Sequence, residues 1–427
     1  MAMKTASGAP AAMPAGTTPQ AKTGFWAWLN KRLPVEEFIT TQMTGYLAPK
    51  NFNIWYFFGS LALAVLVLQL LSGIYLTMFY KVGEASSFDS VEYIMREVNY
   101  GWLIRYLHST GASAFFIVVY LHMYRALLYG SYRAPRELLW LIGMAVYLAL
   151  MAEAFMGYVL PWGNMSFWGA QVIVNLFGTI PAIGPGLVEW IRGDYAIADA
   201  TVNRFFAMHV ALLPIALLLL VVLHLAALHE VGSNNPDGIE IKEKLGPDGK
   251  PLDGIPFHPY YTVKDLVGVG VFFVLFAIVV FFVPTLGGLF LESPNFEPAN
   301  PLSTPEHIAP AWYFTPYYAI LRAVPNQRLG ALLLLLAVML FLFLPWLDRS
   351  PVKSMRYKGW LSRTALALFT VAVLVLGYLG LQPATGLYVV LARIFAVVYF
   401  AYFLLMPIYT RLDPVKPVPE RVTYHAH

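Results

Sequence analysis

The chain has 427 residues, of which 59% are hydrophobic and only 12% charged, about half the charged fraction of an ordinary soluble domain. This composition excludes a soluble globular protein, a disordered chain and a free nucleic-acid-binding protein. The small net charge of +4 gives no sign of a nucleic acid or another polyanion as partner. The absence of cysteine excludes disulfides, iron–sulfur clusters on this chain, thiolate zinc sites and heme attached through Cys-x-x-Cys-His.

The first segments of the chain are predicted to lie outside the bilayer. Residues 1–24 are rich in Ala, Pro, Gly and Thr, lack the apolar stretch of a signal peptide, and are predicted to form a flexible tail. Residues 25–54 include the apolar side chains Phe25, Trp26 and Trp28 in a weakly amphipathic pattern. We interpret this segment as interfacial, lying along the membrane surface, and an ordinary linker is the open alternative.

Eight apolar runs follow, each long enough to cross a bilayer as a helix. They lie at residues 55–79, 103–128, 138–160, 205–228, 266–291, 329–347, 364–381 and 387–408. The predicted fold is therefore an all-α integral membrane protein with eight transmembrane helices. Two long connections, 161–204 and 292–328, are predicted to be functional loops.

The distribution of Lys and Arg predicts the orientation in the membrane. If the N-terminus is cytoplasmic, the cytoplasmic segments hold 20 of the 28 basic residues. Both termini, the 231–265 loop and the 411–427 tail are then cytoplasmic, and loops 161–204 and 292–328 face the opposite side. The orientation and the polar N-terminus indicate a bacterial inner membrane.

Four histidines fall inside predicted spans, where an ionisable side chain is costly and suggests a function. His108 and His122 lie 14 residues apart in the second span, and His209 and His224 lie 15 residues apart in the fourth. Each interval is about four helical turns, so both members of a pair can face the same neighbour. The two spans are parallel, which predicts that His108 meets His209 near the outer face and His122 meets His224 near the inner face. Such pairs could bind two bis-histidine hemes, whereas a single histidine would more often be a helix–helix hydrogen bond.

Glycines and arginines support binding of a flat metal-bearing group. The first and third spans carry glycines at the same 14-residue interval, and a residue without Cβ permits a close approach; ordinary packing of small residues is the alternative. Three arginines near the span ends could pair with heme propionates, or extend to the lipid headgroups instead. The candidate cofactor-binding residues are Gly59, Gly73, Gly143, Gly157, Arg105, Arg125 and Arg204.

Several motifs resemble those of cytochrome b from the respiratory cytochrome bc complex, in the family's order over residues 25–410. They are RYLHSTGASAFFIVVYLHMYRALLYGSY at 105–132, MGYVLPWGNMSFWGAQV at 156–172, RFFAMH at 204–209, HEVGSNNP at 229–236, IPFHPYYTVKD at 255–265, ANPLSTPEHIAPAWYF at 299–314 and AILRAVPN at 319–326.

The resemblance implies a quinol–cytochrome c oxidoreductase subunit with two non-covalent b hemes, a low-potential one at His108 and His209 and a high-potential one at His122 and His224. It implies oxidation of ubiquinol at an outer site and reduction of ubiquinone at an inner site, coupled to proton translocation. One electron passes to a Rieske iron–sulfur protein and the other crosses the membrane. Cytochrome c1, membrane lipid and a second copy of the complex are the further partners implied. Residues 55–230 would form the diheme four-helix bundle, and 266–410 the C-terminal spans.

The family's outer quinol site is matched in part. Its glutamate in a Pro-Glu-Trp-Tyr motif is Ala311 here, which has no group that could accept a proton. We therefore expect a relocated carboxylate, Glu153 or Glu292 ahead of Glu306, with a structural hydrogen bond or loop solvation as alternatives. The remaining outer-site candidates are Tyr158, Phe155, Met156, Gly169, Pro310, Trp312 and Tyr313.

The family's inner quinone site corresponds to residues that flank the cytoplasmic loop. His229 and Asp265 could donate protons to quinone, or could be interfacial residues that satisfy loop backbone. Ser233, Asn234 and Lys264 lie beside them in the motifs.

The 15-residue spacing from His209 to His224 departs from the 14 more usual in respiratory members. A π-bulge or a kink near Pro214 could absorb the extra residue; a changed tilt of the inner heme is the alternative. Two other classes remain possible from sequence, a secondary transporter and a diheme membrane anchor of a dehydrogenase.

Overall fold

The computed structural model describes residues 24–40 and 45–423, and these are mostly helical. Within these described ranges, eight helices are long and apolar enough to cross a membrane, as predicted. A helix suits this role because a backbone in lipid must satisfy its hydrogen bonds internally. These spans are Ile54–Thr77 (η2 and α3), Gly101–Tyr129 (α5), Glu137–Val159 (α6), Asp199–Val231 (α9, η3 and α10), Tyr260–Phe282 (α11), Gln327–Leu347 (α13, η8 and α14), Trp360–Gly380 (α15) and Gly386–Leu404 (α16).

The fifth span differs most from its prediction of 266–291. Helix α11 begins six residues earlier, at Tyr260, and ends at Phe282. Pro284 disfavours helical backbone at Val283, and Gly287 and Gly288 then take positive φ angles. The apolar side chains beyond this point therefore belong to a loop with the short 3₁₀ turn Leu286–Gly288 (η5), not to the helix.

Both long connections contain helices of their own. The 161–204 connection includes α7 (Asn164–Phe177), α8 (Gly184–Arg192) and the start of α9 (Asp199–Ala207). The 292–328 connection includes η6 (Ser293–Phe296), η7 (Trp312–Phe314) and α12 (Thr315–Arg322). The two meet through a backbone bridge between Gly163 and Pro298, which holds the second connection against the start of α7.

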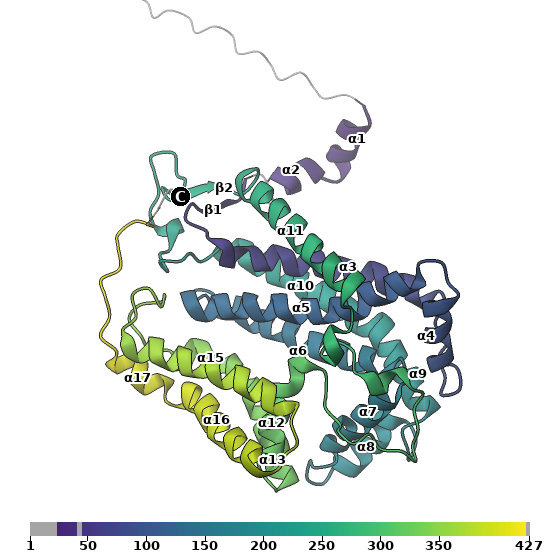
Figure 1. Cartoon of the computed structure of the whole chain (residues 1–427). Helices are drawn as coiled ribbons and strands as arrows, with labels where there is room; N and C mark the ends of the chain where they lie inside the picture. The colour runs from purple at the N-terminus through teal and green to yellow at the C-terminus, as the bar shows by residue number, and fades with distance from the viewer. Residues whose placement is uncertain (1–23, 41–44, 424–427) are drawn as a thin grey trace, which may run out of the picture.

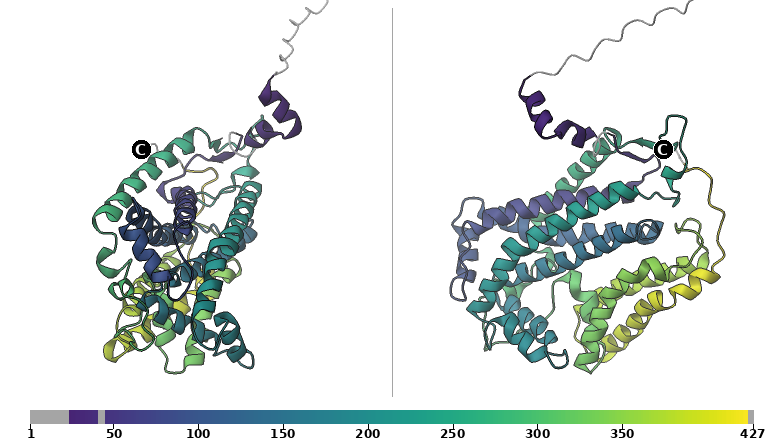
Figure 2. Two further views of the ribbon diagram at one scale, coloured as in Figure 1. Left: turned by 90° about the vertical axis from the view of Figure 1, so that its right-hand side faces the viewer. Right: turned by 180° about the vertical axis from the view of Figure 1, so that it is seen from behind.

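The spans form two groups (Figures 1 and 2). Helix α3 packs on α5 and α6 packs on α10, with α11 on the outside of α3 and α5; α12, α13, α15 and α16 form the second group. Tyrosine hydroxyls join the groups: Tyr147 Oη lies 3.3 Å from Tyr120 Oη and 3.0 Å from Tyr317 Oη. Trp140 Nε1 also donates to the Phe341 carbonyl at 2.7 Å.

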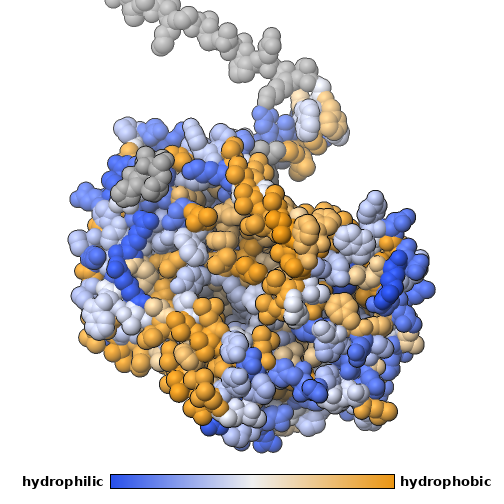
Figure 3. All heavy atoms as spheres, viewed as in Figure 1, coloured by the Kyte–Doolittle hydropathy of each residue, from blue (hydrophilic) through white to orange (hydrophobic). Residues whose placement is uncertain are grey.

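The molecule has two hydrophilic ends separated by an apolar band over α11 and the C-terminal helices (Figure 3). One end carries α4 (Ser87–Arg96) and α7 to α9, and the other carries the two-stranded sheet of β1 (Leu47–Pro49) and β2 (Gly254–Pro256). The chain after α17 (Met406–Leu412) returns to the sheet end, where Arg421 pairs with Asp253 at 2.7 Å. The strand before the first span and the chain after the last span thus both lie at the sheet end of the molecule.

The segment predicted to be interfacial contains two short helices, α1 (Phe25–Arg32) and α2 (Val35–Ile39). Phe25, Trp26 and Trp28 are all exposed, which suits a membrane surface. The tail predicted at residues 1–24 lies outside the described residues except for Gly24, and residues 424–427 of the predicted C-terminal tail also lie outside them.

Candidate functional site

The structure brings together the first predicted histidine pair. His108 on α5 and His209 in the π-helix η3 (Met208–Leu212) have ring centroids 6.1 Å apart, with ring planes at 88°. Ser72 Oγ lies 3.0 Å from His108 Nδ1, and the main-chain oxygen of Glu153 lies 2.9 Å from His209 Nδ1. Both rings are therefore held through Nδ1 by a neighbouring group.

The second pair is arranged in the same way at the other level of the bundle. His122 on α5 and His224 on α10 have ring centroids 6.3 Å apart, at 65°. The Nδ1 atoms of both are buried and have no hydrogen-bond partner among the described residues. The parallel arrangement expected for the second and fourth spans thus places the four histidines at two depths.

Each of the four glycines faces one of these rings. A Cβ added at Gly59 would lie 3.2 Å from His122, at Gly73 3.1 Å from His108, at Gly143 3.0 Å from His224, and at Gly157 2.4 Å from His209. These distances are shorter than ordinary contacts between carbon atoms. Because these glycines on α3 and α6 have no side chain, each leaves room for one histidine ring from α5 or from the fourth span.

Two observations indicate that the histidine pairs could bind a heme-type group. Two imidazole nitrogens on opposite sides of one metal ion, each about 2 Å from it, separate the ring centroids by roughly 6 Å. Both pairs show this separation. A cavity of about 250 Å³ also opens beside the first pair, lined by His108 and His209.

The three candidate arginines have different surroundings. Arg105 lines the cavity beside His108, and the Arg125 guanidinium lies 5.0 Å from the Tyr56 ring near the second pair. Arg204 is exposed and donates to the Trp190 carbonyl, so the structure does not bring it to His209. Its guanidinium lies over Gly193, where a Cβ would approach Cζ to 2.6 Å.

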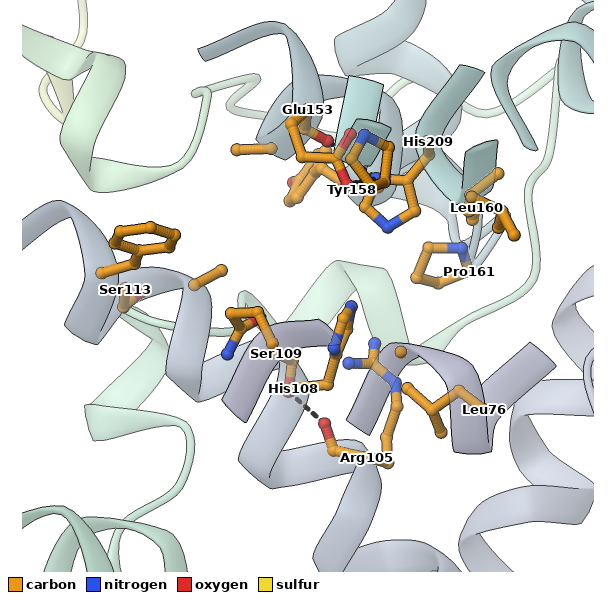
Figure 4. Close-up of a pocket in the computed structure, with 18 of the residues that line it drawn as sticks. Leu76, Arg105, His108, Ser109, Ser113, Glu153, Tyr158, Leu160, Pro161 and His209 are labelled. Atoms are coloured by element: carbon orange, nitrogen blue, oxygen red, sulfur yellow. Dashed lines mark hydrogen bonds and ion pairs between the residues drawn. The ribbon is translucent and has the colours of Figure 1, made fainter. Parts of the chain in front are cut away.

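Figure 4 shows the cavity, with His209, Glu153 and Tyr158 on one side and His108 and Arg105 on the other. Glu153 Oε1 lies 3.0 Å from His209 Nδ1. The Tyr158 hydroxyl donates to Glu292 Oε2 at 3.1 Å, which connects the end of α6 to the 292–328 connection. Burial raises the pKa of Glu292 to about 7. Glu306 belongs to the same connection but does not line the cavity.

The Pro-Ala-Trp-Tyr segment forms another wall of the cavity. Ala311 and Tyr313 line it, and the Tyr313 ring stacks on Phe116 with centroids 3.9 Å apart. Trp312 Nε1 donates to Ser113 Oγ at 3.0 Å, and Pro310 precedes this turn. Phe116 and Ser113 face this segment from α5 and are not among the predicted residues.

The other outer-site candidates surround the cavity without lining it. Phe155 packs on Phe205 of α9, and Met156 belongs to the same apolar cluster. Gly169 is next to the Tyr158 ring, where an added Cβ would be 3.5 Å from Cε1. Adjacent residues point to different sides of a helix, so a continuous motif cannot place all its side chains in one cavity.

The candidates for the inner quinone site fall into separate groups. His229 stacks face to face on Tyr46, with centroids 4.6 Å apart and planes at 9°, and Tyr46 Oη lies 2.7 Å from Ser233 Oγ. Asp265 accepts from Ser60 Oγ at 2.5 Å, inside the second turn of α11. Tyr46 and Ser60 were missed because they are distant in sequence from both motifs.

Two inner-site candidates have other contacts. Asn234 is buried, and its Nδ2 donates to the Tyr129 carbonyl at 2.8 Å and to Ser131 Oγ at 3.1 Å, so its amide secures the end of α5. Lys264 lies within α11, with Nζ 5.6 Å from the centre of the Tyr261 ring. The loop predicted to extend to residue 265 therefore ends earlier, at the start of α11.

The π-helix explains the unusual histidine spacing. Residues Met208–Leu212 form η3 directly before α10 (Leu213–Val231), in which Pro214 occupies the first turn. A π-turn accommodates one residue more than an α-turn, so the fourth span can space its histidines by 15 and still present both to α5. The prediction of a π-bulge near Pro214 is confirmed.

Together, these features define a multi-pass membrane protein with two histidine pairs stacked through one helical bundle. The family model "Cytochrome b/b6/petB" matches residues 43–232, and "Cytochrome b(C-terminal)/b6/petD" matches residues 298–400. The chain belongs to the cytochrome b family. This membership removes the secondary transporter and the dehydrogenase anchor as alternatives.

The relatives match nearly the whole chain. A cytochrome b from Allochromatium vinosum is 61% identical over 412 residues, which are 94% of this chain and 99% of that protein. One from Rhodospirillum rubrum is 47% identical over 93% of this chain and 95% of its own length. A solved structure called "Hyperthermophilic respiratory Complex III" is 38% identical, with a TM-score of 0.84, and covers 91% of this chain and 99% of its own.

Proposed function

We propose that this protein is the cytochrome b subunit of a respiratory complex in a bacterial inner membrane, with both termini on the cytoplasmic side. It oxidises quinol beside the outer histidine pair, near Tyr158 and Glu292, and reduces quinone near His229 and Asp265. The main support for the proposal is that the bundle contains two histidine pairs at different depths, with ring centroids 6.1 Å and 6.3 Å apart. The family, and the Complex III structure that the chain resembles, support it.

The chain's own residues hold two b-type hemes in this proposal. His108 and His209 would hold the outer, low-potential heme, and His122 and His224 would hold the inner, high-potential heme. When bound, the hemes supply one-electron carriers between the two quinone sites. Gly59, Gly73, Gly143 and Gly157 leave room beside the ligands, and Arg105 and Arg125 are placed to pair with propionates.

Glu292 is the carboxylate that replaces the glutamate missing at Ala311. It is half-buried, hydrogen-bonded to Tyr158, and connected through that residue to the cavity. A carboxyl whose pKa is about 7 can accept a proton from quinol near neutral pH and release it to the outer aqueous side. In a Glu292→Gln variant we expect quinol oxidation to slow by 10²- to 10⁴-fold, the usual contribution of a positioned general base. Normal turnover would refute this role.

The partners proposed are a Rieske iron–sulfur protein, cytochrome c1 and a second copy of the complex. One electron from each quinol passes to the Rieske protein and the other crosses to the inner site, which couples turnover to proton translocation. A relative in Bradyrhizobium diazoefficiens carries the name "Cytochrome b/c1", and this chain covers 56% of it. That architecture supports association of this chain with a c1 partner.

An optical redox titration of the intact complex tests the proposal. The wild type should show two b-type components of different midpoint potential. His108→Leu should remove the low-potential component and His122→Leu the high-potential one. A wild-type complex without b-type absorbance, or with a single component, would refute the assignment.

A further inference from the structure

Glu153 makes a double contact with one of the four histidines. Its main-chain oxygen lies 2.9 Å from His209 Nδ1, and its carboxylate Oε1 lies 3.0 Å from the same atom. Both contacts come from α6 to the π-helix of the fourth span. The Nδ1–H group is therefore held by a backbone carbonyl and a carboxylate together.

The other three histidines have no carboxylate on Nδ1 in the part of the chain that the structure describes. His108 Nδ1 has the neutral hydroxyl of Ser72 at 3.0 Å. The Nδ1 atoms of His122 and His224 are buried without a described partner. Among the described residues, the contact with a carboxylate is thus made at the level of the outer pair, and there to His209 and not to His108.

The local geometry restricts both groups to this arrangement. Glu153 and Gly157 are one turn apart on α6, so they face the same neighbour. Gly157 leaves the space that the His209 ring enters, and a Cβ there would approach the ring to 2.4 Å. The Glu153 side chain is 17% exposed and His209 15%, so water screens their contact only weakly. The ring can neither retreat from Gly157 nor rotate without losing the Nδ1 contacts.

We propose that Glu153 is a positioning residue for His209: it directs Nε2 toward the outer heme iron and lowers the reduction potential of that heme. The inference rests on the proposed function. A carboxylate on the remote nitrogen fixes the tautomer and ring orientation of a metal-bound imidazole and makes it a stronger electron donor. A stronger donor favours the oxidised metal, and hydrogen bonding around the ligands is one of the means by which a protein adjusts heme potentials.

This assignment separates the two carboxylates near the cavity. Glu153 contacts the histidine, and Glu292 contacts Tyr158. Of the three glutamates expected from sequence as candidates to receive the quinol proton, Glu292 keeps that role in this proposal. Glu153 acts on electron transfer through His209 instead.

Redox titration of the intact complex, with the wild type, Glu153→Gln, Glu153→Asp and Glu292→Gln, tests the assignment. Glu153→Gln keeps the size of the side chain and removes its charge. We expect it to raise the equilibrium constant for reduction of the low-potential component about tenfold, which is about 59 mV for a one-electron couple. Glu153→Asp keeps the charge and should raise it less. Glu292→Gln, the matched control, removes a nearby carboxylate that is bonded to Tyr158.

The inner component is the internal standard, since its potential should be unchanged in every variant. A shift in Glu153→Gln no larger than in Glu292→Gln would overturn the inference, as would equal shifts of both components. If Glu153→Gln does not assemble, Glu153→Asp decides: a rise in the potential of the low-potential component that is larger than in Glu292→Gln supports the inference, and an unshifted potential overturns it. Absence of two components in the wild type would refute the proposed function instead.

Discussion

Replacement of Gly157 by alanine tests how closely α6 approaches the outer histidine. The added Cβ would lie 2.4 Å from His209 Cε1, 2.9 Å from Nδ1 and 3.0 Å from Nε2. Ordinary contact between carbon atoms is about 3.5 Å or more, so the ring must retreat by about 1 Å. A metal–ligand bond tolerates only about 0.2 Å. The two contacts from Glu153 to Nδ1 oppose this movement, because retreat of the ring lengthens both.

We therefore expect Gly157→Ala to lose the low-potential b-type component and to keep the high-potential one. Gly59→Ala, where the added Cβ would lie 3.2 Å from His122, should keep both components, because its ring needs to move by only a few tenths of an ångström. Gly377→Ala is the matched control, since the nearest atom would be 3.7 Å away and belongs to Pro316.

The measurement is a redox titration of the b-type absorption in purified complexes, with heme content determined by extraction. A Gly157→Ala complex with two normal components and two hemes would refute the argument from close approach. Equal losses in Gly157→Ala and Gly377→Ala would show instead that alanine disturbs the bundle in general.

Three further changes have defined expected outcomes. Deletion of Leu212 shortens the π-helix to an α-helical turn and should keep the high-potential component. Deletion of Leu219 rotates the following part of the helix by about 100° and should abolish that component. Optical redox titration of both variants measures the difference. Quinol oxidation should rise as the pH increases through about 7, because Glu292 must lose its proton to act as acceptor, and this rise should be absent from the residual rate of Glu292→Gln; an unchanged pH profile would contradict the role. Asp237→Asn should lower the unfolding free energy by about 1–3 kcal/mol, measured by thermal unfolding in detergent, because the buried carboxylate accepts from Asn51, Arg356 and Thr423.

The pH dependence of that last contribution has a definite sign. Burial acts to raise the pKa of Asp237, but hydrogen bonds from Thr423, Tyr357 and Arg356 outweigh it and hold the pKa below its usual value. A carboxyl with a depressed pKa stabilises the fold above its unfolded-state pKa, and that stability is lost as the pH falls through the folded-state pKa. Acid should therefore weaken the wild type more than Asp237→Asn. Equal acid sensitivity would contradict the assignment.

The outer site could be predicted only in part, and the reason differs between residues. Tyr158 and Tyr313 lie at the cavity, as their motifs predict, but Phe155 and Met156 pack away from it because neighbouring helical residues diverge. Arg204 was expected beside the outer pair from its position five residues before His209, and instead its guanidinium reaches the loop at Trp190. Spacing along one helix predicts which residues share a face, but not which loop folds over that face.

The sequence alone determined the eight spans, the four intramembrane histidines with their glycines, and the extra residue near Pro214. These features are local: an apolar run must form a helix in lipid, and helical periodicity places residues 14 or 15 apart on nearly the same face. Only the tertiary structure decided that Ser72 and Glu153 meet the outer pair, that Tyr46 stacks on His229, and that Asn234 secures the end of α5. These contacts join residues that are 36 to 183 positions apart, and the crossing of helices and the path of loops set their distances.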